Sequence, residues 1–73
     1  MGITKQLTIR TLKNPDELLY DALTERYVAI NWNHNIAIIH EKTDSDITVV
    51  TIIYSTELRD TVNRRKKTER WIQ

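Results

Sequence analysis

The chain has 73 residues, a net charge of +1, 40% hydrophobic residues and no cysteine. It is therefore one small domain, in which a disulfide framework and a thiolate metal site are excluded. No apolar run approaches the roughly 20 residues of a membrane-spanning helix, and no signal peptide is visible. We expect a cytoplasmic protein with no membrane partner. Its charge is uneven, because two basic ends flank an acidic stretch at residues 14–46, and that asymmetry bears on partners.

The first expected element covers residues 4–13, "TKQLTIRTLK". It can be a helix capped by Thr4, with Ile9 and Leu12 on its buried side, or a strand, because apolar and polar residues also alternate. We favour the helix because the following Asn-Pro-Asp at residues 14–16 is typical of a helix end and turn. "ELLYDA" is then a short extended piece that leads to a loop at residues 23–25.

Residues 26–54 carry the strongest strand signals. "RYVAINW", "IAIIHEK" and "ITVVTIIY" are rich in β-branched and aromatic residues, and "NHN" and "TDSD" between them are typical of turns. An antiparallel meander is the simplest arrangement of such segments. The predicted fold class is α+β: an N-terminal helix, a three- or four-stranded antiparallel sheet, and a C-terminal helix with a short tail.

A second helix is expected after the last strand. Ser55 or Thr56 would be its N-cap, with Glu57 in the first turn, where the helix dipole favours an acid. Its apolar stripe is short, because Leu58 and Val62 are followed on that face by charged residues. The helix is therefore expected to end within residues 65–67, and residues 71–72 to form a brief extended tail that folds back onto the sheet.

The segment "ITVVTIIY" presents a packing problem. Strict alternation places apolar side chains on both faces, with Ile47, Val49 and Ile53 on one and Val50, Ile52 and Tyr54 on the other. Strands that are apolar on both sides belong where both sheet faces are covered. Two short helices are expected to cover only one face, so we predict that a second copy of the chain or a partner protein covers the other. A homodimer is the expected assembly.

The C-terminal stretch "TVNRRKKTERWIQ" concentrates positive charge. Its basic side chains are candidate nucleic-acid ligands: Arg64, Arg65, Lys66, Lys67 and Arg70. They could neutralise phosphates while Trp71 stacks on a base. Equally, basic residues at a helix C-terminus interact favourably with the helix dipole without any ligand. For Trp71 we favour a hydrophobic anchor over a base platform.

Three quoted segments together resemble a known family. "GITKQLTIRTLKNPDELLYDALTERYVAI", "IIHEK" and "VVTIIYSTELRDTVNRRKKTERWI" are similar to the small prokaryotic domain-of-unknown-function family DUF four-two-five-eight. Its archaeal members show a similar order of a Gly-Ile helix, a Pro-Asp turn and an Arg-Arg…Arg-Trp tail. The resemblance implies a distant relation to RelE- and BrnT-like toxins, which are α+β domains with a curved antiparallel sheet, and many of which are ribosome-dependent ribonucleases.

The chain departs from that family at two places. Members usually carry a segment with a His and an Arg before the Gly-Ile helix, whereas this chain starts at Met1. If that pair is functional in relatives, this chain is expected to bind without catalysing, and a sheet face would lie uncovered. Members also tend to have Gly before the arginines that correspond to Arg26 and Arg70, where this chain has Glu25 and Glu69.

The resemblance also suggests catalytic candidates. RelE-like ribonucleases use basic side chains, often with a Tyr, so Tyr54 with Arg64, Arg65 and Arg70 would be the nearest candidates for a metal-independent endoribonuclease. The alternative, which we favour for Tyr54, is a side chain that closes the core with its hydroxyl at the edge.

The two histidines carry little chemical signal. His34 lies in an expected turn, and His40 stands beside Glu41 on a strand, where neighbours point to opposite faces and form no dyad. Neither has metal-ligand spacing, and the acidic turn at residues 44–46 is too short for a calcium loop. We expect neither a metal site nor a cofactor.

Three functions remain. The leading hypothesis is a RelE/BrnT-toxin-like module that binds RNA or a ribosome surface through the basic end of its C-terminal helix. The alternative is a protein-interaction module that binds an antitoxin-like protein or another partner, dimerises through an apolar sheet face and has no nucleic-acid activity. An active endoribonuclease assisted by Tyr54 is the third.

Overall fold

The computed structural model describes residues 4–73, so the Gly-Ile pair of the family resemblance lies outside the described residues. The helices and strands follow the chain as α1 (Lys5–Lys13), β1 (Glu17–Asp21), β2 (Arg26–Asn31), β3 (Ile36–Lys42), β4 (Ile47–Tyr54), α2 (Leu58–Lys67) and β5 (Trp71–Ile72). The predicted α+β class is confirmed. Within the described residues, neither helix is long and apolar enough to cross a membrane.

Helix α1 confirms the helical interpretation of residues 4–13. The Thr4 side chain caps it by accepting a hydrogen bond from the Leu7 N–H at 3.0 Å, and the helix ends just before the Asn-Pro pair. The expectation that Ile9 is buried was wrong, because its side chain is exposed. At about 100° per residue, Ile9 lies roughly opposite Leu7 and Thr11. Thr11 is the buried residue of the helix, and its hydroxyl accepts a hydrogen bond from the Asn31 amide at 3.1 Å.

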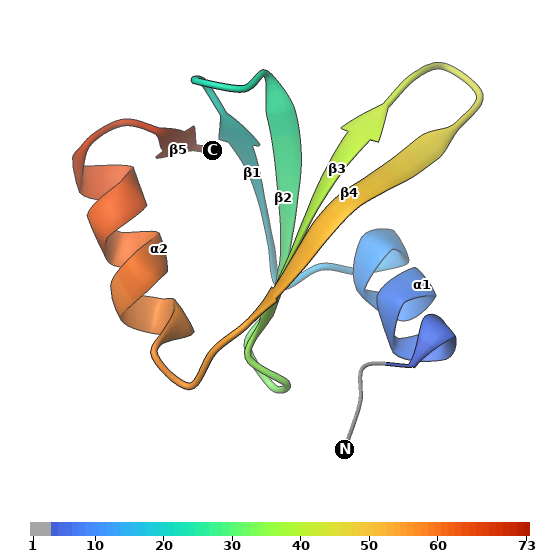
Figure 1. The fold of residues 1–73 in the computed structure, drawn as a ribbon, viewed down its shortest axis with the longest axis horizontal. Helices are drawn as coiled ribbons and strands as arrows, with labels where there is room; N and C mark the ends of the chain where they lie inside the picture. Colours follow the sequence, from blue (N-terminus) through green and yellow to red (C-terminus); the bar gives the residue numbers. More distant parts are fainter. Residues whose placement is uncertain (1–3) are drawn as a thin grey trace.

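The sheet is an antiparallel meander with strand order β4-β3-β2-β1-β5 (Figure 1). It contains five strands rather than three or four, because the C-terminal tail folds back and pairs with β1. In this pairing Trp71 lies opposite Asp21, and Ile72 opposite Tyr20. The predicted return of the tail to the sheet is therefore confirmed, and β4 and the two-residue β5 form the two edges of the sheet.

The two helices pack on opposite faces of the sheet, so the expectation that both would cover one face was wrong (Figure 1). The α2 face holds the larger core cluster, made of Leu19, Val28, Ile30, Ala37, Leu58, Val62 and Trp71. The α1 face holds a smaller cluster, Ala29, Ile36 and Ile38, against which Leu7, Leu12 and Ile52 pack. Each helix is too short to cover a whole face. The α1 face is the one left more open.

A β-bulge in β4 changes which of its side chains share a face. Thr51 lies opposite Ile39, but Val49 lies opposite the next residue, His40, so Val50 is the extra residue. A bulge inserts one residue and shifts the alternation beyond it. The expected division of β4 was therefore wrong. The α1 face receives Ile47, Val49, Ile52 and Tyr54, whereas Ile53 lies on the α2 face with Ala37.

The start of α2 also differs from expectation. Its N-cap is Glu57, which makes no side-chain capping bond. Neither Ser55 nor Thr56 is the cap. The Ser55 hydroxyl accepts from the Glu57 N–H at 3.0 Å and the Ser55 carbonyl from the Leu58 N–H at 3.2 Å. These bonds complete a turn that precedes the helix, so the helix begins later than it would with Ser55 as its N-cap.

The end of α2 is a Schellman motif. The Arg70 N–H donates to the Arg65 carbonyl at 2.9 Å and the Glu69 N–H to the Lys66 carbonyl at 3.0 Å, which is the bond pair that defines this motif. The residue after the cap adopts a left-handed conformation, and here it is Glu69, with φ 61°. Glycine is usual at this position because it has no Cβ. Glu25, which likewise precedes an arginine, also has a positive φ, 59°.

Replacing Glu69 with glycine is therefore expected to raise the free energy of unfolding by about 1 kcal/mol, because the left-handed backbone costs a residue with a Cβ roughly that much. Urea unfolding followed by circular dichroism measures the change. Lys42→Gly in β3 is the control, because Lys42 forms no ion pair with residues 4–73 and a strand glycine at negative φ should destabilise. A destabilised Glu69→Gly protein would contradict the role given to this backbone geometry.

Candidate functional site

Asp21 fixes the C-terminal tail to the sheet. Its Oδ2 accepts a hydrogen bond from the Trp71 indole N–H at 3.1 Å, and its Oδ1 accepts from the Leu23 and Thr24 N–H groups at 2.9 and 3.2 Å. Burial alone would raise the pKa of Asp21, but these hydrogen bonds and the Arg70 charge outweigh burial and hold the pKa below its ordinary value. The Arg70 Nε lies 3.5 Å from Oδ1 as an ion pair, without hydrogen-bond geometry. Arg70 therefore holds the tail in place.

Lys66 is likewise engaged within the chain. Its Nζ lies 2.6 Å from Glu17 Oε1, and Glu17 also accepts hydrogen bonds from the Trp32 indole at 3.0 Å and the Gln73 amide at 3.2 Å. The hydrogen bond from Lys66 is the main cause that lowers the pKa of Glu17. Partial burial raises this pKa, whereas the Lys66 charge and the hydrogen bonds from Trp32 and Gln73 lower it further. This carboxylate thus joins α2, β1, the β2–β3 turn and the end of the chain.

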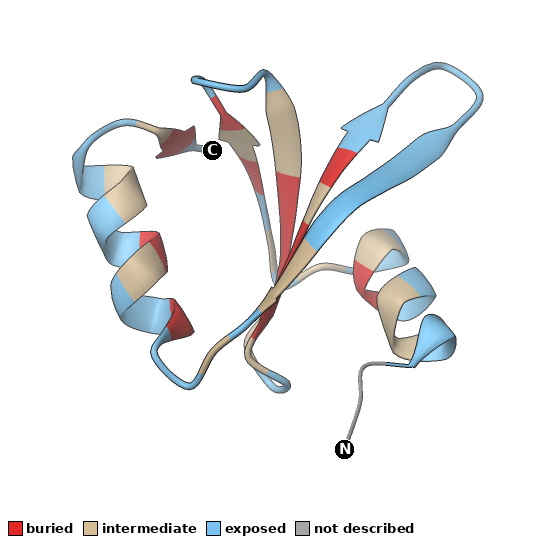
Figure 2. Cartoon of the chain, viewed as in Figure 1, coloured by how far each residue is buried: buried red, intermediate tan, exposed pale blue. Residues whose placement is uncertain are grey.

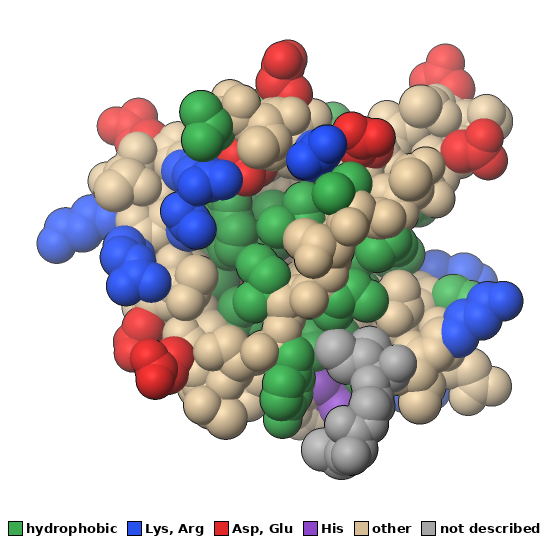
Figure 3. All heavy atoms as spheres, in the orientation of Figure 1, with side chains coloured by type: hydrophobic (Ala, Val, Ile, Leu, Met, Phe, Trp, Pro, Cys, Tyr) green, Lys and Arg blue, Asp and Glu red, His purple; other side chains and the backbone are tan. Residues whose placement is uncertain are grey.

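Arg65 lies against the tail as well, with its guanidinium carbon 5.7 Å from the centre of the Trp71 ring, within the range of a cation–π contact. Three of the five candidate nucleic-acid ligands, Arg65, Lys66 and Arg70, therefore contact other side chains of the domain. Arg64 and Lys67 are exposed and form no ion pair with residues 4–73. In the cationic surface over α2 (Figure 3), two charges are thus paired with carboxylates, one lies against the Trp71 ring, and two have no ion-pair partner among residues 4–73.

Tyr54 is not near that cluster. It is the last residue of β4, it lies on the α1 face opposite Ile36, and its side chain is exposed. Helix α2 packs on the other face, and its basic residues lie at the end of the helix that is farther from β4 in the chain. The structure therefore does not bring Tyr54 together with Arg64, Arg65 or Arg70. It also does not place Tyr54 in the core.

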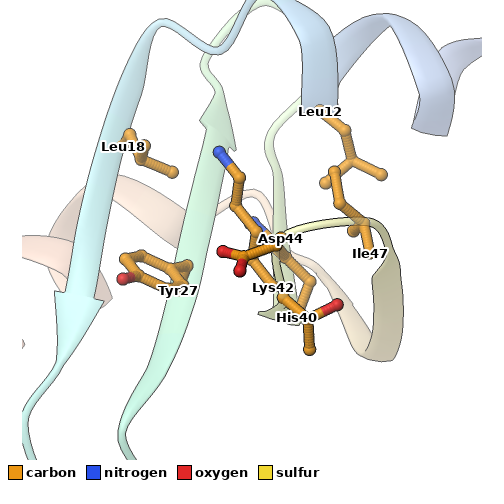
Figure 4. Close-up of a pocket in the computed structure, with 8 residues that line it drawn as sticks. Leu12, Leu18, Tyr27, His40, Lys42, Asp44 and Ile47 are labelled. Atoms are coloured by element: carbon orange, nitrogen blue, oxygen red, sulfur yellow. The ribbon is translucent and has the colours of Figure 1, made fainter.

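A hollow of about 320 Å³ lies on the α1 face, at the end of the sheet near the β3–β4 turn (Figure 4). Its apolar walls include Leu12, Leu18 and Ile47, and its polar groups come from Tyr27, His40, Lys42 and Asp44. His40 is buried, and its Nδ1 lies 3.0 Å from the Ile38 carbonyl. In the neutral ring Nδ1 then carries the hydrogen and Nε2 is an acceptor. The adjacent Glu41 pairs instead with Arg26 at 3.1 Å.

Sequence reasoning missed this hollow, because its polar residues come from two strands and a turn. Only the i, i+2 spacing of His40 and Lys42, which puts both on one face of a strand, could have suggested it. With a neutral His40 the hollow presents a hydrogen-bond acceptor, and Lys42 and Asp44 contribute one charge of each sign. Among residues 4–73, no three His, Asp or Glu side chains are grouped closely enough to hold a metal ion.

The most exposed apolar surface belongs to β4, which Figure 2 shows as exposed over most of its length. Ile47, Val49, Val50 and Tyr54 are all exposed large hydrophobic residues. On the same α1 face, at the opposite edge of the sheet, Leu18 and Ile72 are exposed too. Helix α1 covers the middle of this face and leaves both flanks open. Edge strands of this kind are where sheets add further strands or partners.

Comparisons of the chain with protein-family models, with curated proteins and with solved structures found no match.

Proposed function

We propose that this domain is a protein-interaction module that binds its partner through β4 and the open flank of the α1 face. The observation that carries the proposal is the edge strand itself. Its eight residues, "ITVVTIIY", include no charge and no proline. Soluble domains usually protect a long edge strand with such residues, and an unprotected one is a site for strand pairing. The bulge at Val50 is the one protective feature β4 has.

The intramolecular contacts of the basic cluster also support this choice. Phosphate binding by Lys66 or Arg70 would compete with Glu17 and Asp21, the carboxylates that hold α2 and β5 to the sheet. Nucleic-acid affinity depends on the number of phosphates that a protein neutralises. A surface in which two of the five charges are paired with carboxylates of the same domain is a weaker phosphate site than the sequence implied.

Affinity capture with the tagged chain as bait, from a lysate that also contains an untagged copy, tests the proposal. A bound protein, either a different chain or the untagged copy, is expected to copurify with the bait, and Val49→Lys should abolish copurification because it places a charge in the apolar edge. Leu23→Lys is the matched control: it makes the same change at an exposed residue of the β1–β2 turn and should have no effect. Equal copurification of both variants would overturn the assignment of the site to β4.

RNA binding is the second candidate function, favoured by the exposed Arg64 and Lys67 on α2 and by the resemblance to RelE- and BrnT-like toxins. If it is correct, the domain binds single-stranded RNA with an affinity that falls steeply with salt. Arg64→Ala/Lys67→Ala should then reduce the slope of log K against log salt by about 1.4, that is, 0.7 per phosphate contact. No binding at low salt would exclude it. Growth arrest on expression that is lost in Tyr54→Phe would favour an endoribonuclease.

A further inference from the structure

We propose that the partner of β4 is the β4 strand of a second copy of this chain, paired antiparallel about a twofold axis so that the two sheets become continuous. This inference rests on the proposed function of β4 as an interaction edge. The strand is eight residues long, forms one edge of the sheet and hydrogen-bonds only to β3 among the described strands. Its outward N–H and C=O groups are therefore available to another strand.

The charge pattern of β4 suits pairing with itself. A twofold axis brings the residues nearest to it close to their own copies, so a Lys or Glu in the middle of β4 would approach a like charge, which is unfavourable. Residues 47–54 contain no charge. If Ile47 lies opposite Tyr54 of the second copy, the first flanking pair is Asp46 with Ser55, so no like charges oppose each other there either.

The bulge selects that register. Opposed residues in an antiparallel pair must point to the same face of the sheet. Because Val50 is the extra residue, Ile47, Val49, Ile52 and Tyr54 all lie on the α1 face. If Ile47 pairs with Tyr54, and hence Val49 with Ile52, opposed residues point to the same face at every pair except the central Val50 and Thr51. This register also uses the whole strand. A register centred on Val50 or on Thr51 would oppose residues of different faces.

This pairing gives the exposed apolar side chains a partner. Each copy contributes four apolar residues of β4 to the α1 face, three of them exposed in the single chain: Ile47, Val49 and Tyr54. Across the axis they would form one apolar surface between the two α1 helices. Cross-strand contacts between β-branched and aromatic residues of this kind stabilise a sheet. A small domain, which buries a smaller fraction of its surface by itself than a larger domain does, gains from such an assembly.

Sedimentation equilibrium of the wild-type chain at 1–200 µM tests the assembly. We expect a mass of twice the 8.7 kDa of the single chain. Val49→Lys should raise the dissociation constant at least roughly tenfold, because it adds a charge to an uncharged edge. Leu23→Lys should leave the dissociation constant unchanged. Circular dichroism melting shows that both variants are folded, and Thr48→Lys replaces Val49→Lys if the latter is not.

Disulfide trapping tests the register. Because the sequence contains no cysteine, any disulfide must involve the introduced residues. Ile47→Cys/Tyr54→Cys places cysteines opposite each other, with Cα atoms about 5 Å apart, which suits a disulfide. Val49→Cys/Tyr54→Cys is the matched control, because its cysteines are diagonal neighbours at roughly 7–8 Å. The first variant should form a covalent dimer under mild oxidation, and the second should form no covalent dimer.

A wild-type chain that is monomeric at 200 µM overturns the proposal, and so does a dimer that is unaffected by the lysine variants at positions 48 and 49. Equal trapping of both cysteine pairs overturns the register. A monomeric wild type that still copurifies with another protein through Val49 would overturn the second copy as partner but leave the proposed function of β4 intact. A monomeric wild type that also copurifies with no other protein would overturn the proposed function as well.

Discussion

Replacing Trp71 with alanine is expected to lower the free energy of unfolding by about 3–5 kcal/mol, the range for truncating a buried tryptophan. The side chain is only 2% exposed and packs in the α2-face core with residues such as Leu19 and Val62. Its indole N–H also donates a hydrogen bond to Asp21 Oδ2 at 3.1 Å. The substitution therefore removes a large apolar surface, leaves a cavity and takes a hydrogen bond from a buried carboxylate.

The loss is large on the scale of this domain. At about 0.05–0.15 kcal/mol per residue, a chain of this length has roughly 4–11 kcal/mol of stability in total. Urea unfolding followed by far-ultraviolet circular dichroism measures the difference, with Ile72→Ala as control. Ile72 is the neighbouring β5 residue and is exposed, so its truncation should cost less than about 1 kcal/mol. If Trp71→Ala cost no more than Ile72→Ala, Trp71 would not be the anchor of the tail.

Local sequence signals predicted most of the elements. Capping by Thr4, the Asn-Pro helix end and the β-branched strand segments all act within a few residues, and the structure confirms each of them. The faces of β4 could not be predicted in the same way. They depend on the bulge at Val50, which exists only in the pairing with β3. The placement of the helices on opposite faces also follows from tertiary packing. Helical periodicity indicates which side of a helix is apolar, but not which face of the sheet the helix covers.

The candidate site shows the same division between local and distant information. The basic run at residues 64–67 is plain in the sequence, but its internal partners are not, because Glu17 is 49 residues from Lys66. Asp21 is 50 residues from Trp71. The return of the tail as β5 brings these pairs together. The interpretation of Trp71 as a hydrophobic anchor was correct because burial of tryptophan is a property of the residue type, whereas its acceptor depends on strand pairing.

Replacing Asp21 with alanine is expected to cost about 2–4 kcal/mol, because it leaves the buried Trp71 N–H and two backbone N–H groups of the turn without their acceptor. It also leaves Arg70 without its counter-charge. Asp21→Asn should cost less, since an amide oxygen can still accept from Leu23 and Thr24. Urea unfolding at pH 7 measures both. Equal stability of Asp21→Ala and wild type would show that the carboxylate does not hold the tail.

The same carboxylate makes stability depend on pH in the acid range. The pKa of Asp21 is lower in the folded chain than its ordinary value, so its contribution is complete above about pH 4, where the unfolded chain ionises. It is lost as the pH falls through the lower folded pKa. Glu17 acts in the same sense through Lys66. Wild-type stability should therefore decrease between about pH 5 and pH 2, and the decrease should be smaller in Asp21→Asn and smallest in Glu17→Gln/Asp21→Asn. An unchanged pH profile in the double variant would assign the acid sensitivity to other carboxyl groups.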